Sequence, residues 1–405
     1  MTTCHYPNVK TFISNVLRDN AVFKALKESR ATFIFHAILC FAGIKGKINF
    51  LQMQRFLKKS EQYFRIHFAN RFNFQSFNLA MIQKRNPECV IAFDPSYIPK
   101  SGKKTYGLDA YWSGCARTVK RGLEICGFAV IDTIIKTAFH LNAIQTPKSK
   151  NFNLLKYYCQ TLKEHFLYFK ELSNYLVADA FFARKEVVET IISLGMHFIS
   201  RLHKNAALFY LNREPKTGKR GRPKKFAGRI NTENPDMNYF TLVFNSTEMK
   251  VYNAIVYSKA FMCNINLSIT VFYDEKGKES RNLYFSTDLN MDGVKIVTWY
   301  RSRFQIEFLY RDAKQYCGLE DCQARSKNKL DFHFNAALTT VNIAKLYWME
   351  TRQSDKEQFS MANFKTLTHN TMMIERFICE FAIDPNSPKI QSKIKKLINY
   401  GLIVA

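Results

Sequence analysis

Apolar residues recur with two different periods along the chain, and the changes of period divide it into regions. Residues 1–85 show helical spacing among many basic positions, as in LQMQRFLKKSEQYFRIHFANRFNF, without a strand pattern. Residues 86–203 predict three strands, a helix, a strand, a helix and a strand, because short apolar runs alternate with amphipathic segments. That order is typical of a mixed α/β domain built around one central sheet.

Two further changes of pattern follow. Residues 204–290 contain a basic loop, TGKRGRPKKFAG, and then β-rich runs such as YFTLVFN and NLSITVFYD. Residues 291–345 return to helical spacing and are predicted to complete the core, and residues 346–405 form a helical C-terminal region. The fold class is therefore α/β, with a β-rich insertion between the two parts of the core. The helical N-terminal region is predicted to contact DNA, with a purely structural bundle as the alternative.

The charge balance indicates a polyanionic partner. Sixty Lys and Arg residues against 33 Asp and Glu leave a formal charge of +27. Neutralising phosphates with such a surface releases counterions and favours nucleic acid, with an anionic membrane as the main competitor. The longest apolar run, at 31–44, is too short to span a bilayer and predicts a buried helix. With scattered cysteines and no signal-peptide pattern, we expect a cytoplasmic protein without a membrane segment.

Two carboxylates follow apolar strand patterns. Asp94 ends VIAFD and Asp179 ends YLVAD, at the place where open α/β sheets carry functional groups. Each has a structural alternative. Asp94 could belong to an Asp-Pro turn, and Asp179 could cap a helix that starts near Ala183.

A third carboxylate stands in YRSRFQIEFLYRDAK, residues 300–314. On one continuous helix, four residues at offsets of zero, three, seven and fourteen share an arc of about 60°, namely Tyr300, Arg303, Glu307 and Lys314. Arg311 lies beside them, and the apolar residues fall on another face. The simpler interpretation is an exposed i,i+4 ion pair between Arg303 and Glu307, which leaves the tyrosine and lysine unexplained.

Three acids from separate segments suit divalent metal ions. Mg²⁺ takes oxygen ligands and keeps positions open for phosphate oxygens and water. Two such ions can act on both the attacking and the leaving oxygen at phosphorus, while neighbouring Arg and Lys side chains hold phosphates. This combination favours phosphodiester chemistry over glycoside or peptide hydrolysis.

The pattern Tyr-x2-Arg-x3-Glu-x6-Lys resembles the signature of a large group of bacterial insertion-sequence DDE transposases, over about residues 88–345. VIAFD and YLVAD resemble the segments that carry the two aspartates of that family. The resemblance implies a ribonuclease H-like core in which Asp94, Asp179 and Glu307 bind two Mg²⁺ ions, with Mn²⁺ as a substitute. It also implies that Tyr300, Arg303 and Lys314 contact transposon-end DNA.

A second DNA contact is predicted in KRGRPKK. Arg-Gly-Arg-Pro is the core of an AT-hook, whose arginines enter a narrow minor groove, and the alternative is a flexible loop that holds phosphates nonspecifically. The residues concerned are Arg220, Arg222, Lys224 and Lys225. Six basic residues around the loop after Asp94 either line the substrate groove or are simply solvated: Lys100, Lys103, Lys104, Arg117, Lys120 and Arg121.

The sequence thus predicts a DDE transposase that cleaves transposon-end DNA and transfers the freed strand into target DNA. The resemblance implies a homodimer in a synaptic complex on terminal inverted repeats. Two alternatives stay open: a ribonuclease H-like nuclease that only hydrolyses, and a catalytically inactive DNA-binding derivative.

Overall fold

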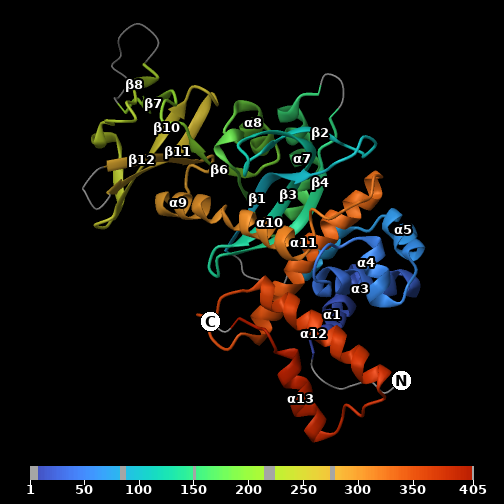
Figure 1. Ribbon diagram of the computed structural model, residues 1–405. Coiled ribbons are helices and arrows are strands. Elements are labelled where there is room, and N and C mark those ends of the chain that lie inside the picture. Colours follow the sequence, from blue (N-terminus) through green and yellow to red (C-terminus); the bar gives the residue numbers. More distant parts are fainter. Residues whose placement is uncertain (1–7, 83–87, 149–151, 214–223, 274–278, 404–405) are drawn as a thin grey trace.

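One large mixed sheet forms the centre of the molecule (Figure 1). The computed structural model describes residues 8–82, 88–148, 152–213, 224–273 and 279–403. Helices cover both faces of the core sheet, and the N- and C-terminal helical regions lie together at one end. The predicted α/β class is confirmed.

Five strands make the core of this sheet, in the order β4-β3-β1-β5-β6. Their bounds are β1 (Cys89–Pro99), β3 (Thr118–Asp132), β4 (Thr137–Gln145), β5 (Tyr175–Val177) and β6 (His197–Leu202). Within this core, β3 pairs antiparallel with both β1 and β4. β5 pairs parallel with β1, and β6 pairs parallel with β5. An antiparallel meander continued by parallel strands is the ribonuclease H-like arrangement that the sequence predicts.

The β-rich segment extends this sheet instead of forming a second one. β12 (Glu279–Ser286) pairs antiparallel with β6, and β11 (Cys263–Tyr273) and β10 (Met249–Ser258) follow. The remaining strands are β2 (Asp109–Ser113) on β3, β7 (Leu208–Leu211), β8 (Phe226–Arg229) and β9 (Thr241–Asn245). In Figure 1 this extension projects from the core at the upper left. The proposed limits of the separate domains stay predictions.

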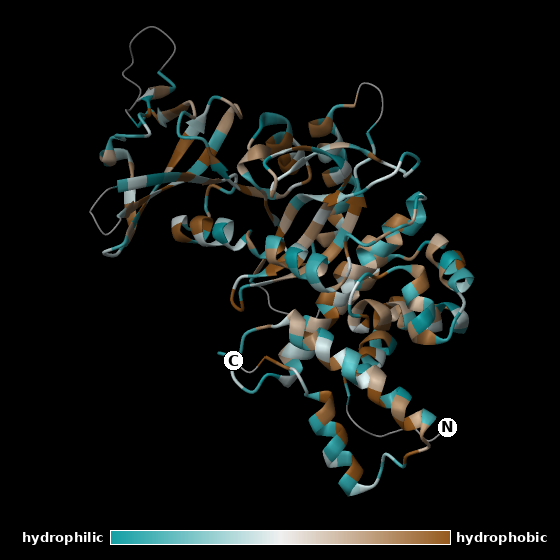
Figure 2. Cartoon of the chain, in the orientation of Figure 1, coloured by the Kyte–Doolittle hydropathy of each residue, from teal (hydrophilic) through white to brown (hydrophobic). Residues whose placement is uncertain are grey.

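The core strands bury both faces, which explains their nearly continuous apolar sequence. Val90 and Ala92 of β1 join a core beneath α10 (Gln305–Tyr316) and α11 (Lys327–Thr351). Ile91 and Phe93 point to the other face and pack with α7 (Leu154–His165) and α8 (Lys185–Ser193). Figure 2 shows the resulting concentration of hydrophobic residues in the central strands.

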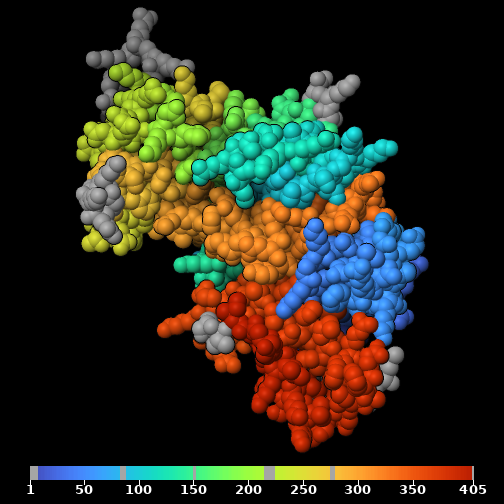
Figure 3. All heavy atoms as spheres, viewed as in Figure 1, coloured from blue at the N-terminus to red at the C-terminus, as the bar shows by residue number. Residues whose placement is uncertain are grey.

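The N-terminal and C-terminal helices share one core. In the part of residues 1–88 that the structure describes, six helices precede the sheet: α1 (Val9–Asp19), α2 (Ala21–Lys24), α3 (Glu28–Gly43), α4 (Phe50–Leu57), α5 (Glu61–Ala69) and α6 (Phe74–Ile82). α3 packs against α11 and α12 (Met361–Glu380), and α13 (Pro388–Ile398) packs on α12, so blue and orange atoms adjoin in Figure 3. The apolar run at 31–44 is the buried part of α3, as predicted. Within the described residues, no helix is long and apolar enough to cross a membrane.

Side chains of α11 form hydrogen bonds with the backbone N–H and carbonyl groups along the outer edge of β4. Asn342 accepts from the His140 N–H at 2.7 Å and donates to the His140 carbonyl at 2.8 Å, and Asn335 does the same at Ala143, at 2.9 and 3.0 Å. Asn335 and Asn342 are seven residues apart on the helix, and His140 and Ala143 are three residues apart on the strand. Both separations span roughly 10 Å, so the spacing of the two side-chain amides matches that of their backbone partners. Lys345 adds a bond to the Ala138 carbonyl at 2.6 Å. α11 thereby takes the place of a neighbouring strand.

We predict that Asn342→Ala lowers the free energy of unfolding by about 3 kcal/mol, because it leaves the buried N–H and carbonyl of His140 without partners. Urea and thermal denaturation measure the loss. The matched control is Asn264→Ala, at an exposed position of β11, which should change stability by less than about 0.5 kcal/mol. Equal stability of the two variants would contradict the role assigned to Asn342.

Candidate active site

Asp94 lies within β1 and not at its end. The predicted Asp-Pro turn is wrong, because β1 continues through Pro95 to Pro99 and Asp94 stands opposite Gly127 of β3. Among the described residues, β5 pairs with β1 only at Ile91 and Ala92, so from Asp94 onward β1 has an open edge where proline is tolerated. The Asp94 side chain is 19% exposed.

Asp179 follows β5 by two residues. Its carboxylate accepts a hydrogen bond from the Ala180 N–H at 2.6 Å and caps the short 3₁₀ turn Ala180–Phe182. Asp179 therefore does not cap the helix expected near Ala183. That helix is α8, which begins at Lys185 and has Arg184 at its N-cap position. Because β5 runs parallel to β1, the residues that follow its carboxyl end lie toward the same end of the strands as Asp94.

The segment from 300 to 314 is two helices and not the single predicted helix. α9 (Gly293–Ser302) ends just before Arg303, and α10 begins at Gln305. The Arg303 N–H bonds to the Tyr300 carbonyl and the Glu307 N–H to the Phe304 carbonyl, both at 3.1 Å, which are i→i−3 contacts of a tightened turn. The common arc calculated for one regular helix therefore does not hold across this turn.

Arg303 nevertheless joins two of the three predicted acids. Its guanidinium lies 3.5 Å from the Asp94 carboxylate and donates to the Glu307 carboxylate at 2.9 Å. The side chain is only 13% exposed, and its Nε has no hydrogen-bond partner among the described residues. Tyr300 completes the set, since its hydroxyl lies 3.5 Å from the Asp179 carboxylate, at the outer limit of a hydrogen bond.

The acids influence one another electrostatically. Burial raises the pKa of Asp94 to about 7; Arg303 opposes that rise, and the carboxylates of Glu307 and Asp179 add to it. Burial by itself lowers the pKa of Arg303, but Asp94 and Glu307 more than offset this, so its pKa is raised. Three carboxylates around one guanidinium leave an excess of negative charge.

The donor set fits a divalent cation in its chemistry, because all three groups offer the hard oxygen ligands that Mg²⁺ and Mn²⁺ prefer. In the present arrangement, however, Arg303 and Tyr300 lie against the carboxylate oxygens. Within the described residues, no three His, Cys, Asp or Glu side chains are grouped closely enough to hold one metal ion. Metal binding at this site therefore requires these two partners to move.

The other predicted DNA contacts lie around this centre or apart from it. Lys314 donates to the Tyr97 carbonyl at 2.9 Å and pairs with Glu320 at 3.2 Å. Arg311 pairs with Asp312 at 3.3 Å and lies 4.7 Å from the centre of the Phe308 ring.

The basic loop belongs to the β extension. Lys224 is exposed, and the ammonium of Lys225 lies 4.7 Å from the centre of the Tyr257 ring. Arg220 and Arg222 lie outside the described residues. The roles of all these side chains in DNA binding stay predictions.

Tyr310 is a contact that sequence analysis missed. Its hydroxyl donates to the Asp94 carbonyl at 2.6 Å, which fixes α10 against β1 at the position of the first carboxylate. The approach requires Gly127, because a Cβ there would lie 1.9 Å from the Tyr310 hydroxyl oxygen. The only sequence signal is a glycine inside a strand, which marks a close approach without naming the partner.

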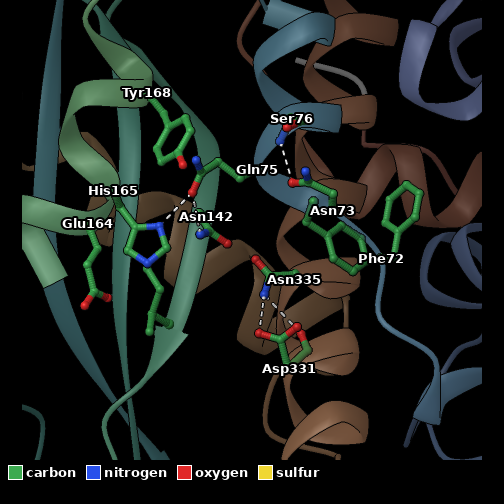
Figure 4. A pocket seen from close by; sticks show the side chains of 12 residues that line it. Phe72, Asn73, Gln75, Ser76, Asn142, Glu164, His165, Tyr168, Asp331 and Asn335 are labelled. Carbon is green, nitrogen blue, oxygen red and sulfur yellow. Dashed lines mark hydrogen bonds between the residues drawn. The ribbon is translucent and has the colours of Figure 1, made fainter.

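A cavity of about 420 Å³ lies elsewhere, between α6, β4, α7 and α11 (Figure 4). His165 Nδ1 and Asn142 Nδ2 both contact the side-chain Oε1 of Gln75, at 2.8 and 3.0 Å, and Asp331 lies near Asn335. None of the three predicted catalytic acids lines it. The cavity is therefore separate from the candidate active site.

Comparison with known families identifies the family of the chain. The family model described as a transposase DDE domain matches residues 86–343, which include all three acids and the β extension. The chain belongs to this family. The transposase thus acts in DNA transposition, and its family works on DNA with divalent metal ions. No curated protein matches the chain. Membership of the subgroup with the Tyr-Arg-Glu-Lys signature stays a prediction.

We predict that Gly127→Ala destabilises the transposase by about 2 kcal/mol or more, because the added methyl group overlaps the Tyr310 hydroxyl. In the double variant Gly127→Ala/Tyr310→Phe, the nearest clashing atom is gone, so part of the stability returns. Thermal denaturation of the complete mutant cycle measures this coupling. Gly114→Ala is the control, since no atom lies within 4 Å of its added Cβ. Additive effects of the two changes would contradict the assigned contact.

Proposed function

We propose that this transposase cleaves the ends of its own element and joins the freed 3′-OH to target DNA, with Asp94, Asp179 and Glu307 as its metal-binding carboxylates. The observation that supports the proposal is the position of the Arg303 guanidinium between Asp94 of β1 and Glu307 of α10, with the Tyr300 hydroxyl 3.5 Å from Asp179 in the turn after β5. Two Mg²⁺ ions, or Mn²⁺ in their place, would supply Lewis-acid activation of the attacking and leaving oxygens at phosphorus.

Arg303 is assigned two successive roles. Without DNA it neutralises Asp94 and Glu307, which keeps two nearby carboxylates compatible with a partly buried site. A DNA phosphate offers the same planar recognition to a guanidinium, and the unpartnered Nε provides a further donor for it. We infer that Arg303 moves from the carboxylates to a phosphate when DNA binds, which frees the acids for metal.

The surrounding residues position the DNA. Lys314, 25% exposed, and Arg311, half exposed on α10, are proposed to contact DNA phosphates, whereas Tyr300 is buried and would reach DNA only after the same rearrangement as Arg303. The net charge of +27 supports a long contact with the phosphate backbone. The proposed substrate is a pair of terminal inverted repeats, held by a homodimer in a synaptic complex. The helical N-terminal region is proposed as a further DNA contact.

The first test is Glu307→Gln, which removes one charged oxygen ligand while preserving shape. We expect cleavage of end DNA with Mg²⁺ to fall by roughly a thousandfold or more, with duplex binding retained. Gel assays on labelled end DNA measure cleavage, and fluorescence anisotropy measures binding. The control is Glu189→Gln, on an exposed part of α8. Undiminished cleavage by Glu307→Gln would refute the assignment.

The same assay with ends that already carry a 3′-OH separates transposition from simple hydrolysis. Joined products with target plasmid are expected from the wild-type protein. A protein that cleaves but never joins would be a hydrolytic nuclease instead.

The second test addresses the exchange by Arg303. Without DNA, Arg303→Ala should bind Mn²⁺ about fivefold more tightly than the wild-type protein, because the competing guanidinium is absent. Duplex end DNA should tighten Mn²⁺ binding to the wild-type protein but leave the variant nearly unchanged. Titration followed by electron paramagnetic resonance measures free Mn²⁺. Arg301→Ala, at an exposed neighbouring position of α9, is the control. Weaker Mn²⁺ binding by Arg303→Ala would contradict the exchange.

A further inference from the structure

The β2–β3 hairpin exposes an apolar pair that its own chain does not cover. Trp112 of β2 and Val119 of β3 stand directly opposite each other, and their exposed fractions are 59% and 58%. Side chains directly opposite in an antiparallel pair share one face, so the two form a continuous apolar surface. Such a surface indicates a partner when charged residues surround it.

The opposite face of this hairpin is fixed to the core. Tyr111, next to Trp112, is buried and donates hydrogen bonds to the carbonyls of Gly107 and Thr146. Successive residues of a strand point to opposite faces, so burial of Tyr111 directs Trp112 outward. The hairpin is therefore a supported arm with one free face.

Positive charge without an ion pair lies near the apolar pair. Five exposed basic residues lie on the hairpin and the loop before it: Lys103, Lys104, Arg117, Lys120 and Arg121. Arg121 shares the face of Trp112 and Val119, whereas Lys120 stands opposite Tyr111 on the other face. None of them forms an ion pair with an acid in the described part of the chain. The one acid between 100 and 121 is Asp109, whose carboxylate accepts from the Ala110 N–H at 2.6 Å. This cluster therefore has no counter-charge of its own.

We propose that the β2–β3 hairpin is a DNA-binding arm, in which Trp112 stacks on a base and Arg121, on the same face, holds a neighbouring phosphate together with Lys103, Lys104 and Arg117. The proposal rests on the proposed function of the acid site. An exposed aromatic ring among cations is the chemistry that binds nucleic acid at unstacked bases, where every base offers a face for stacking. A second protein chain would require acidic partners, and this chain is strongly basic.

The pairing register sets an upper limit on the distance between this arm and Asp94. Gly127 stands opposite Asp94, and Val119 lies eight residues away along β3. At about 3.3 Å per residue the arm lies at most roughly 26 Å from Asp94. That length corresponds to about eight base pairs at about 3.4 Å each. The arm is thus expected to touch the DNA end within about eight base pairs of the cleaved phosphate.

Two binding measurements test the arm. Trp112→Ala should weaken binding of end DNA with an unpaired region by about tenfold, whereas Tyr400→Ala, at a 79% exposed aromatic residue, should leave it unchanged. Arg117→Ala/Arg121→Ala should lower the slope of log affinity against log salt by about 1.8, and Lys393→Ala/Lys396→Ala is its control. Circular dichroism verifies that each variant is folded.

A tethered probe tests the position. Cys115 in the hairpin turn and Cys379 on α12 are both exposed. An iron chelate that cuts DNA is attached to Cys115 in the variant Cys4→Ser/Cys379→Ser. Strand breaks are expected within about eight base pairs of the cleavage site. The matched control carries the chelate at Cys379 with Cys4→Ser/Cys115→Ser and should give no breaks there.

The outcomes distinguish the arm from the acid site. Normal binding by Trp112→Ala and by the double basic variant, or breaks absent near the end, overturns the arm, while cleavage by the wild-type protein still upholds the proposed function. A change of oligomeric state in Trp112→Ala with unchanged DNA affinity also overturns it, in favour of a contact between copies. Failure of the wild-type protein to bind or cleave end DNA overturns both proposals.

Discussion

Carboxylates that gather in a partly buried site repel one another unless a positive charge lies among them, and in this transposase Arg303 supplies that charge. The side chain belongs to the tightened turn between α9 and α10, and this turn sets the position of the guanidinium. It brings the guanidinium between Asp94 of the sheet and Glu307 of the next helix. The same contact explains how the carboxylates are stable without a bound cation, and the proposed metal binding would require it to rearrange.

The position of Arg303 depends in turn on how α10 rests on the sheet. Tyr310 reaches the Asp94 carbonyl through the space that Gly127 leaves, so the strand that carries the first acid also anchors the helix that carries the third. α11 closes the sheet edge beyond, with Asn335 and Asn342 bonded to β4. The site is therefore built on regular elements whose mutual positions are fixed by buried polar contacts, which is the support that precise chemistry needs.

The sequence predicted most of the plan because its signals are local. Apolar runs that end in aspartate indicated Asp94 and Asp179, and the α/β class follows from the order of elements. The break before α10 escaped prediction because neither glycine nor proline marks it, and it coincides with the pairing of Arg303 with Asp94, a residue distant in the sequence. Continuation of β1 through Pro95 was likewise invisible, since it depends on how short the neighbouring β5 is. Contacts between distant segments leave no periodic trace in a single sequence.

The central claim is that three carboxylates from separate segments hold divalent metal together when DNA is present. A crystal structure of the transposase with its end DNA and Mn²⁺, analysed by anomalous scattering, tests it most directly. The account predicts Mn²⁺ within about 2.5 Å of oxygens of Asp94, Asp179 and Glu307, and the Arg303 guanidinium on a DNA phosphate. Mn²⁺ bound away from these residues, or Arg303 still joined to both carboxylates in the complex, would contradict the account.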